Sequence, residues 1–218
     1  MSLFSFFKPD RPQPPAPPQE MEIPLFPLKS VLFPGGVLAL KVFEQRYLDM
    51  SAACLKDDRP FGICLILQGE EVGANASEPA STHTIGTLAH VTQWDMEQLG
   101  ILQLAVRGGR RFRILECHTG AGGLQCARVQ LLDEPAKTAV PEAQAALLPL
   151  LRKVAADIGP EKMPEPHDWD DACWVGYRLT EVMPVQLLAK QKLLELDDPV
   201  SRLEILYRYL EPRGFFGN

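Results

Sequence analysis

The sequence lacks a hydrophobic run long enough for a membrane-spanning helix, which needs about 18 consecutive apolar residues. Its longest uncharged apolar stretch, Val31 to Leu40, is interrupted by Pro34, Gly35 and Gly36. The N-terminus has no leading basic residue of the kind that secretory signal peptides carry. We therefore expect a protein that has no membrane partner and is not exported.

Cysteine is also sparse, and its pattern excludes a disulfide framework. The five cysteines are odd in number and form no CxxC pair, which favours reduced, buried thiols and a cytoplasmic location. Cys117, His118 and Cys126 match no standard zinc spacing, and no fourth ligand is evident. We expect neither a metal nor another cofactor.

Catalytic motifs are missing as well. The sequence contains no GxxxxGK[ST] phosphate loop, no GxGxxG fingerprint, no GxSxG elbow and no HExxH zinc pair. Each of these motifs places a nucleophile, a phosphate cradle or a metal in a defined geometry, so their absence argues against the corresponding chemistry. We expect no catalytic residues and no enzyme activity.

Basic residues are fewer than acidic ones, 22 against 28, which gives a net charge of −6. This balance argues against nucleic acid as the main partner. One local exception remains, because four arginines flank Gly108 and Gly109, a pair that predicts a hairpin turn. An alternative interpretation is therefore an RNA-binding protein that uses this basic hairpin, formed by Arg107, Arg110, Arg111 and Arg113.

Proline, in contrast, is abundant, and its distribution divides the chain. Six of the 20 prolines lie between Lys8 and Glu20, where they favour a solvated polyproline tether. Residues 1–20 are thus predicted to be a Pro-rich tail. Ahead of the prolines is a small apolar patch that packs on the body or is offered to a partner, and the sequence leaves this choice open: Leu3, Phe4, Phe6 and Phe7.

Two kinds of hydrophobic period follow the tail. Residues 21–134 show short apolar runs separated by glycine, typical of antiparallel strands, with one helix at 45–56 and a polar loop at 69–82. Residues 135–218 change to helical spacing. Four helices are expected there, the first from Pro141 with a kink at Pro149, the second capped by Asp170 or Asp171, and the last capped by Asp198.

Several ordered motifs resemble the N-terminal, substrate-binding domain of Lon proteases over residues 21–210. They are IPLFPLKSVLFPGG at 23–36, VFEQRYL at 42–48, IGTLA at 85–89, GRRFR at 109–113 and KQKLLELDDPVSRLE at 190–204. Two positions depart from the family pattern. Gln45 and Ala39 stand where that pattern usually has proline.

The resemblance implies an α+β fold, with a β-rich PUA-like pseudo-barrel subdomain followed by a C-terminal helical bundle. It implies a stand-alone Lon-like unit without the ATPase and protease modules, because the sequence contains neither the phosphate loop of the ATPase nor the protease segment. The function expected is a non-catalytic protein-binding module for unfolded or apolar polypeptide segments, or an adaptor in protein quality control. Apolar residues at predicted turns are the candidate contacts: Phe33, Trp94 and Met96. The oligomeric state is left open.

Overall fold

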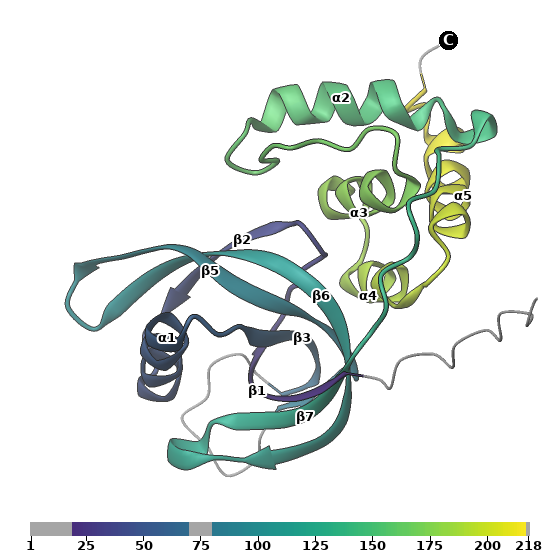
Figure 1. Ribbon diagram of the computed structural model, residues 1–218. Helices are drawn as coiled ribbons and strands as arrows, with labels where there is room; N and C mark the ends of the chain where they lie inside the picture. Colours follow the sequence, from purple (N-terminus) through teal and green to yellow (C-terminus); the bar gives the residue numbers. More distant parts are fainter. Residues whose placement is uncertain (1–18, 70–79, 217–218) are drawn as a thin grey trace, which may run out of the picture.

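Strands dominate the first part of the chain and helices the last part in the computed structural model, which describes residues 19–69 and 80–216 (Figure 1). The strands are β1 (Glu20–Leu28), β2 (Val37–Val42), β3 (Phe61–Gln68), β4 (Ser81–Thr82), β5 (Ile85–Gln98), β6 (Ile101–Thr119) and β7 (Gln125–Leu131). Residues 1–18 of the predicted tail, with its apolar patch, and residues 70–79 of the polar segment lie outside the described residues, whereas Glu20 already belongs to β1.

Five of the strands close into a barrel. β1 pairs with β7, β7 with β6, β6 with β5 and β5 with β3, all antiparallel, and a parallel pairing of β3 with β1 completes the circuit. β2 adds to the first half of β6, and the short β4 adds to β3. Closure leaves the barrel strands with few free edges.

The barrel core forms because alternate strand residues are apolar. Helix α1 (Gln45–Asp57) contributes Tyr47, Met50 and Cys54 to the same buried cluster as Phe26 and Phe61 from the strands. The rings of Phe26 and Tyr47 lie 4.2 Å apart between centroids. α1 therefore packs on the barrel through one face, as its helical spacing predicts.

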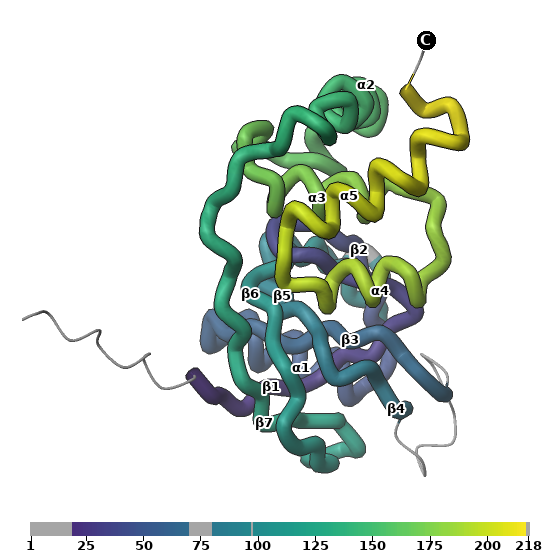
Figure 2. Tube along the Cα trace, turned by 90° about the vertical axis from the view of Figure 1, so that its right-hand side faces the viewer, coloured from purple at the N-terminus to yellow at the C-terminus, as the bar shows by residue number. Residues whose placement is uncertain are grey.

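The last part of the chain forms α2 (Leu147–Ile158), α3 (Ala172–Val182), α4 (Leu187–Glu195) and α5 (Pro199–Leu210), with 3-10 turns at Glu142–Gln144 and Glu211–Arg213. A further 3-10 turn, Ala121–Gly123, lies between β6 and β7. Asp171 caps α3 by accepting from the N–H groups of Cys173 and Trp174, and Asp198 caps α5 at Ser201. Figure 2 shows these helices stacked on one side of the strands. The α+β class is confirmed.

Two local predictions are wrong. α2 begins at Leu147 and not at Pro141. Pro149 therefore lies in the first turn, where its missing N–H breaks no helical bond and causes no kink. The predicted hairpin at Gly108 and Gly109 is also wrong, because β6 runs straight through both glycines and the turn lies between Gln98 and Ile101.

The reason for Gly108 is close approach of another segment. A Cβ at this position would lie 2.1 Å from the carbonyl oxygen of Phe33. Gly108 also donates its N–H to the carbonyl of Gly36, and Gly35 donates to the carbonyl of Gly108 (2.8 Å each). The glycine thus lets the turn before β2 lie directly on β6.

This turn also joins the barrel to the helices. The ring of Phe33 packs against that of Tyr177 from α3 at 5.6 Å, and Arg178 donates to the carbonyl of Pro34 at 2.7 Å. Gln191 from α4 donates to the carbonyl of Ile85 at 3.0 Å. Side-chain packing and hydrogen bonds therefore fix the helical part on the barrel.

Candidate functional site

Three exposed apolar side chains of the barrel part gather at the end of the β5–β6 hairpin. Trp94 is 61% exposed, Met96 43% and Leu99 94%. Figure 1 shows this hairpin projecting from the barrel past α1. We call these three residues the hairpin-tip patch.

The register explains why the patch is exposed. Trp94 pairs with Leu104, so the two side chains point to the same face of the hairpin. Leu104 is 3% exposed because β6 lies between β2 and β5 here and its side chain joins the core cluster, whereas Trp94 lies on β5 beyond the residues that pair with β3. The core-facing row of the sheet thus continues into solvent as an apolar surface.

The sequence predicts a connection over residues 93–100 that contains Trp94 and Met96; the structure finds both side chains exposed, but on strand β5. Leu99 lies in the same predicted connection and is not singled out by the sequence, although it is the residue that forms the turn with Gly100. Gly100, with a φ of 82°, was the available signal, since this left-handed conformation favours glycine.

Phe33 does not belong to this surface. Its side chain is 0% exposed and lies in a cluster with Ile85, Cys173, Tyr177 and Leu194 at the junction with the helices. The expectation that Phe33 contacts a partner is wrong, because a turn residue that links two packed parts is buried from both sides.

The four arginines of the predicted basic hairpin do not form one surface. Arg111 is 0% exposed, donates to the carbonyl of Leu194 at 2.9 Å and pairs with Asp197 at 3.0 Å. Arg110 donates to the carbonyl of Leu132. Arg107 is half-buried and Arg113 exposed. Since β6 is continuous here, alternation sends these side chains to different faces, and the RNA-binding alternative loses its basis in a hairpin.

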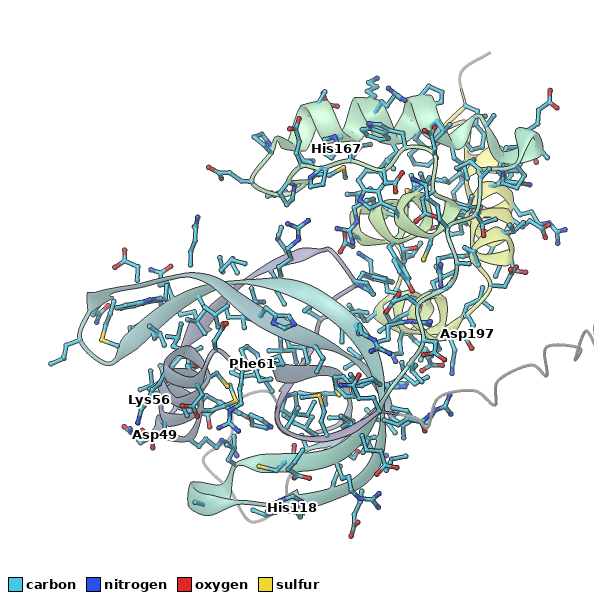
Figure 3. The ribbon with its side chains drawn as sticks, in the orientation of Figure 1. Asp49, Lys56, Phe61, His118, His167 and Asp197 are labelled. Carbon is cyan, nitrogen blue, oxygen red and sulfur yellow. The ribbon has the colours of Figure 1, made fainter. Side chains whose placement is uncertain are left out.

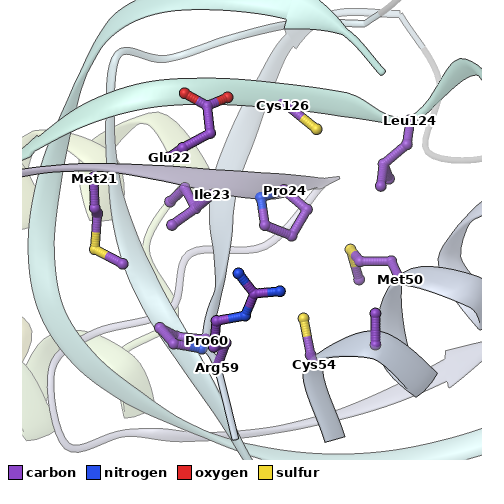
Figure 4. A pocket seen from close by; sticks show the side chains of 11 residues that line it. Met21, Glu22, Ile23, Pro24, Met50, Cys54, Arg59, Pro60, Leu124 and Cys126 are labelled. Atoms are coloured by element: carbon purple, nitrogen blue, oxygen red, sulfur yellow. The ribbon is translucent and has the colours of Figure 1, made fainter. Parts of the chain in front are cut away.

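A concavity lies between β1, the end of α1 and the start of β7. This groove has a volume of about 260 Å³, and Figure 4 shows the Arg59 guanidinium among its apolar side chains. Arg59 pairs with Asp57 at 2.7 Å and is 69% exposed. Chemically the groove offers apolar contact, one guanidinium and one carboxylate, from the lining residues Met21, Glu22, Ile23, Pro24, Met50, Ala53, Cys54, Arg59, Pro60, Leu124 and Cys126.

The thiols and imidazoles are not arranged for catalysis or metal binding. Burial raises the pKa of the thiols of Cys54 and Cys64, which disfavours the thiolate that a nucleophile would need. Cys117 pairs with Ala127 and His118 with Cys126, so Cys117 and His118 point to opposite faces of β6. Figure 3 places His118 and His167 at opposite ends of the molecule. Across residues 19–69 and 80–216 no three potential ligands converge.

One carboxylate has a strongly shifted pKa, and it lies at the junction. Burial raises the pKa of Glu181 on α3 to about 7, against the opposing effects of Arg178 and Lys190. Arg178 donates to its Oε1 at 3.1 Å, and Lys190 donates to its backbone carbonyl at 2.7 Å. Since all three groups hold α3, α4 and the Pro34 turn together, this cluster is structural.

The described residues thus form a closed barrel joined to four helices, with an apolar hairpin end. Residues 22–211 match the family described as the ATP-dependent protease La (LON) substrate-binding domain. The chain therefore belongs to the LON substrate-binding domain family. None of the helices in the described part of the chain is both long and apolar enough to cross a membrane.

Similar proteins support this assignment. The Lon protease of Escherichia coli strain K12 is 27% identical over 206 residues, covering 88% of this chain and 25% of that protein. Lon protease 2 of Myxococcus xanthus is 32% identical over 144 residues, covering 66% of this chain and 17% of that protein. The chain thus matches a quarter or less of the length of these relatives.

Solved structures agree on the fold. The crystal structure of a Lon N-terminal domain protein from Xanthomonas campestris has a TM-score of 0.71 and 32% identity, covering 87% of this chain and 98% of that one. The N-terminal domain of the Mycobacterium avium complex Lon protease has a TM-score of 0.60 at 20% identity, covering 88% and 98%. The match is to the substrate-binding domain, and not to the ATPase or protease parts of Lon.

Proposed function

We propose that this chain is a non-catalytic module that binds exposed apolar segments of unfolded polypeptides, and that the hairpin-tip patch is its contact surface. The observation that carries the proposal is that Trp94, Met96 and Leu99 are exposed together at the end of the β5–β6 hairpin, with Trp94 on the face of the sheet that Leu104 presents to the core. The family to which the chain belongs is named for substrate binding, which supports the same function.

The chemistry of the patch suits partners of varied sequence. Burying apolar surface is worth about 25 cal/mol per Å² and is non-directional, so it requires no fixed geometry in the partner. Met96 adapts its shape to different side chains, and Trp94 offers a large rigid face. Such a surface holds a segment without acting on its bonds.

Two mutants test this contact surface. We expect the double variant Trp94→Ser, Met96→Ser to weaken binding of reduced and carboxymethylated α-lactalbumin, a permanently unfolded polypeptide, by at least about tenfold. The thermal unfolding midpoint should stay close to that of the unmodified protein, because both side chains are already exposed. Fluorescence anisotropy of the labelled polypeptide measures the affinity.

Leu67→Ser is the matched control. Leu67 is 59% exposed, and β3 runs away from the hairpin, since Phe61 pairs with Ala89 and Ile63 with Thr87. Equal loss in the control and the double variant would show nonspecific apolar adhesion and contradict the assigned surface. Absence of binding by the unmodified protein at tens of micromolar would contradict the function itself.

A further inference from the structure

The outer edge of β2 is a second feature that a polypeptide could use. β2 pairs with β6 along its whole length, from Val37 opposite Arg107 to Val42 opposite Leu102, without a register shift. On its other side it has no strand partner within the described part of the chain. A regular strand of this kind presents a row of free backbone donors and acceptors.

The direction of these groups follows from one hydrogen bond. Gly108 donates its N–H to the carbonyl of Gly36, and this bond flanks the pair Val37–Arg107. Val37 is therefore in a non-hydrogen-bonded pair, and bonding to β6 begins at Leu38 and then alternates. The N–H and C=O groups of Val37, Ala39 and Lys41 consequently point away from β6, to the outer edge.

The edge is also accessible. The side chains of Ala39 and Lys41 are exposed, and Phe43, directly after the strand, is 49% exposed. The projecting part of β5 is a poorer edge, because its pairing with β6 has register shifts between Val91 and Gln93 and between Asp95 and Gln98. Bulges of this kind disrupt further pairing.

We propose that the outer edge of β2 binds an extended segment of an unfolded polypeptide as an additional β-strand. This inference rests on the proposed function and adds its main-chain component. Hydrogen bonds to Val37, Ala39 and Lys41 recognise an extended backbone whatever its sequence, because every residue except proline offers both groups. The hairpin-tip patch supplies apolar contact, and the β2 edge selects chains that are unfolded enough to pair.

The size of the edge favours such a segment over a second copy of the chain. β2 has six residues, whereas a stable interface between proteins takes roughly 20–30 residues from each partner. A pairing of two β2 edges alone is too small to hold a dimer. A single extended segment needs no more than this length, and its weak, reversible pairing suits transient capture.

Ala39→Pro is the decisive variant, with Ala39→Val as its matched control. Proline removes the outward N–H of residue 39 and leaves the bonds of Leu38 and Leu40 to β6 in place, which edge strands tolerate. Residue 39 is exposed on an edge strand, so the variant should fold. We expect Ala39→Pro to weaken binding of carboxymethylated α-lactalbumin by roughly three- to tenfold, as for one lost hydrogen bond, and Ala39→Val to bind normally.

Hydrogen exchange of individual amides, followed by NMR on the unmodified protein, gives an independent readout. The amides of Ala39 and Lys41 should exchange fast in the free protein and slow on addition of the unfolded polypeptide, whereas those of Leu38 and Leu40 are slow throughout. Fast exchange of Ala39 and Lys41 in the complex would overturn the proposal, even if Ala39→Pro failed to fold.

The outcomes separate this inference from the proposed function. Equal binding by the proline and valine variants, with normal binding by the unmodified protein, would reject the edge and leave the hairpin-tip patch as the whole site. No binding by the unmodified protein would reject the proposed function. Slow exchange of Ala39 that depends on the concentration of the protein alone would assign the edge to a second copy and overturn the proposal.

Discussion

Among single residues, Glu181 combines burial with a functional group that normally stays charged. Its pKa is raised to about 7 because burial penalises the carboxylate, although Arg178 stabilises it. The folded protein therefore holds a proton on Glu181 between the ordinary pKa of about 4.5 and pH 7, where the unfolded chain has lost it. The contribution of Glu181 to the free energy of unfolding is fully present below pH 4.5 and is lost as the pH rises through about 7.

Glu181→Gln should remove this pH dependence, because an amide of nearly the same shape does not titrate. We expect the free energy of unfolding of the variant, relative to the unmodified protein, to increase as the pH rises from 5 to 8. Urea unfolding at several pH values measures it. Glu204→Gln, at a carboxylate that is 46% exposed on α5, is the control and should show no such trend. A flat difference for Glu181→Gln would contradict the argument.

Among the elements, β6 can pack against the turn before β2 only because residue 108 is glycine. A Cβ at Gly108 would lie 2.1 Å from the carbonyl oxygen of Phe33, so a larger residue must displace either β6 or the turn before β2. Gly108→Ala should therefore lower the free energy of unfolding by at least about 2 kcal/mol, as overpacking does. Gly120→Ala is the control, since its nearest neighbour is the Sγ of Cys126 at 3.2 Å. Similar urea midpoints for the two variants would show that the contact relaxes freely.

The helices and strands could largely be predicted from local chemistry. Asp198 predicts the start of α5, because a carboxylate before the first turn accepts hydrogen bonds from its free N–H groups. In the structure it accepts from the N–H of Ser201. The pair Gly108 and Gly109 was misread because glycine serves two purposes, tight turns and close approach of another segment. Only tertiary structure distinguishes them, since the carbonyl of Phe33 comes from a distant part of the chain.

The candidate site could be predicted only in part, for the same reason. Trp94 and Met96 were identified from their place in a polar connection, and both are exposed. Phe33 had the same apparent setting, yet α3 covers it with Tyr177. The direction of the β2 backbone groups depends on the register with β6, which no local pattern reveals.

For the whole molecule, Arg111 connects the barrel to the helices. It lies on β6, is fully buried, and reaches the carbonyl of Leu194 and the carboxylate of Asp197 beyond α4. Figure 3 shows Asp197 at this junction. Because the guanidinium is fully buried and donates a hydrogen bond to the carbonyl of Leu194, we expect Arg111→Met to cost about 1.5–3 kcal/mol.

Arg113→Met is the matched control, two residues further along β6 and exposed. It should change the free energy of unfolding by less than about 0.5 kcal/mol. Urea unfolding followed by tryptophan fluorescence and by circular dichroism measures both variants. If Arg111→Met were as stable as Arg113→Met, the junction would depend on apolar packing alone.

The closure of the barrel sets the order in which the chain can fold as it is synthesised. β1 pairs on one side with β3, at Leu25 opposite Gly62, but on the other side with β7, at Glu20 opposite Gln130. During synthesis β1 must therefore wait for β7 before both of its edges are paired, and part of its apolar surface stays uncovered meanwhile. A nascent chain of this protein is itself, for that interval, an unfolded polypeptide with exposed apolar segments.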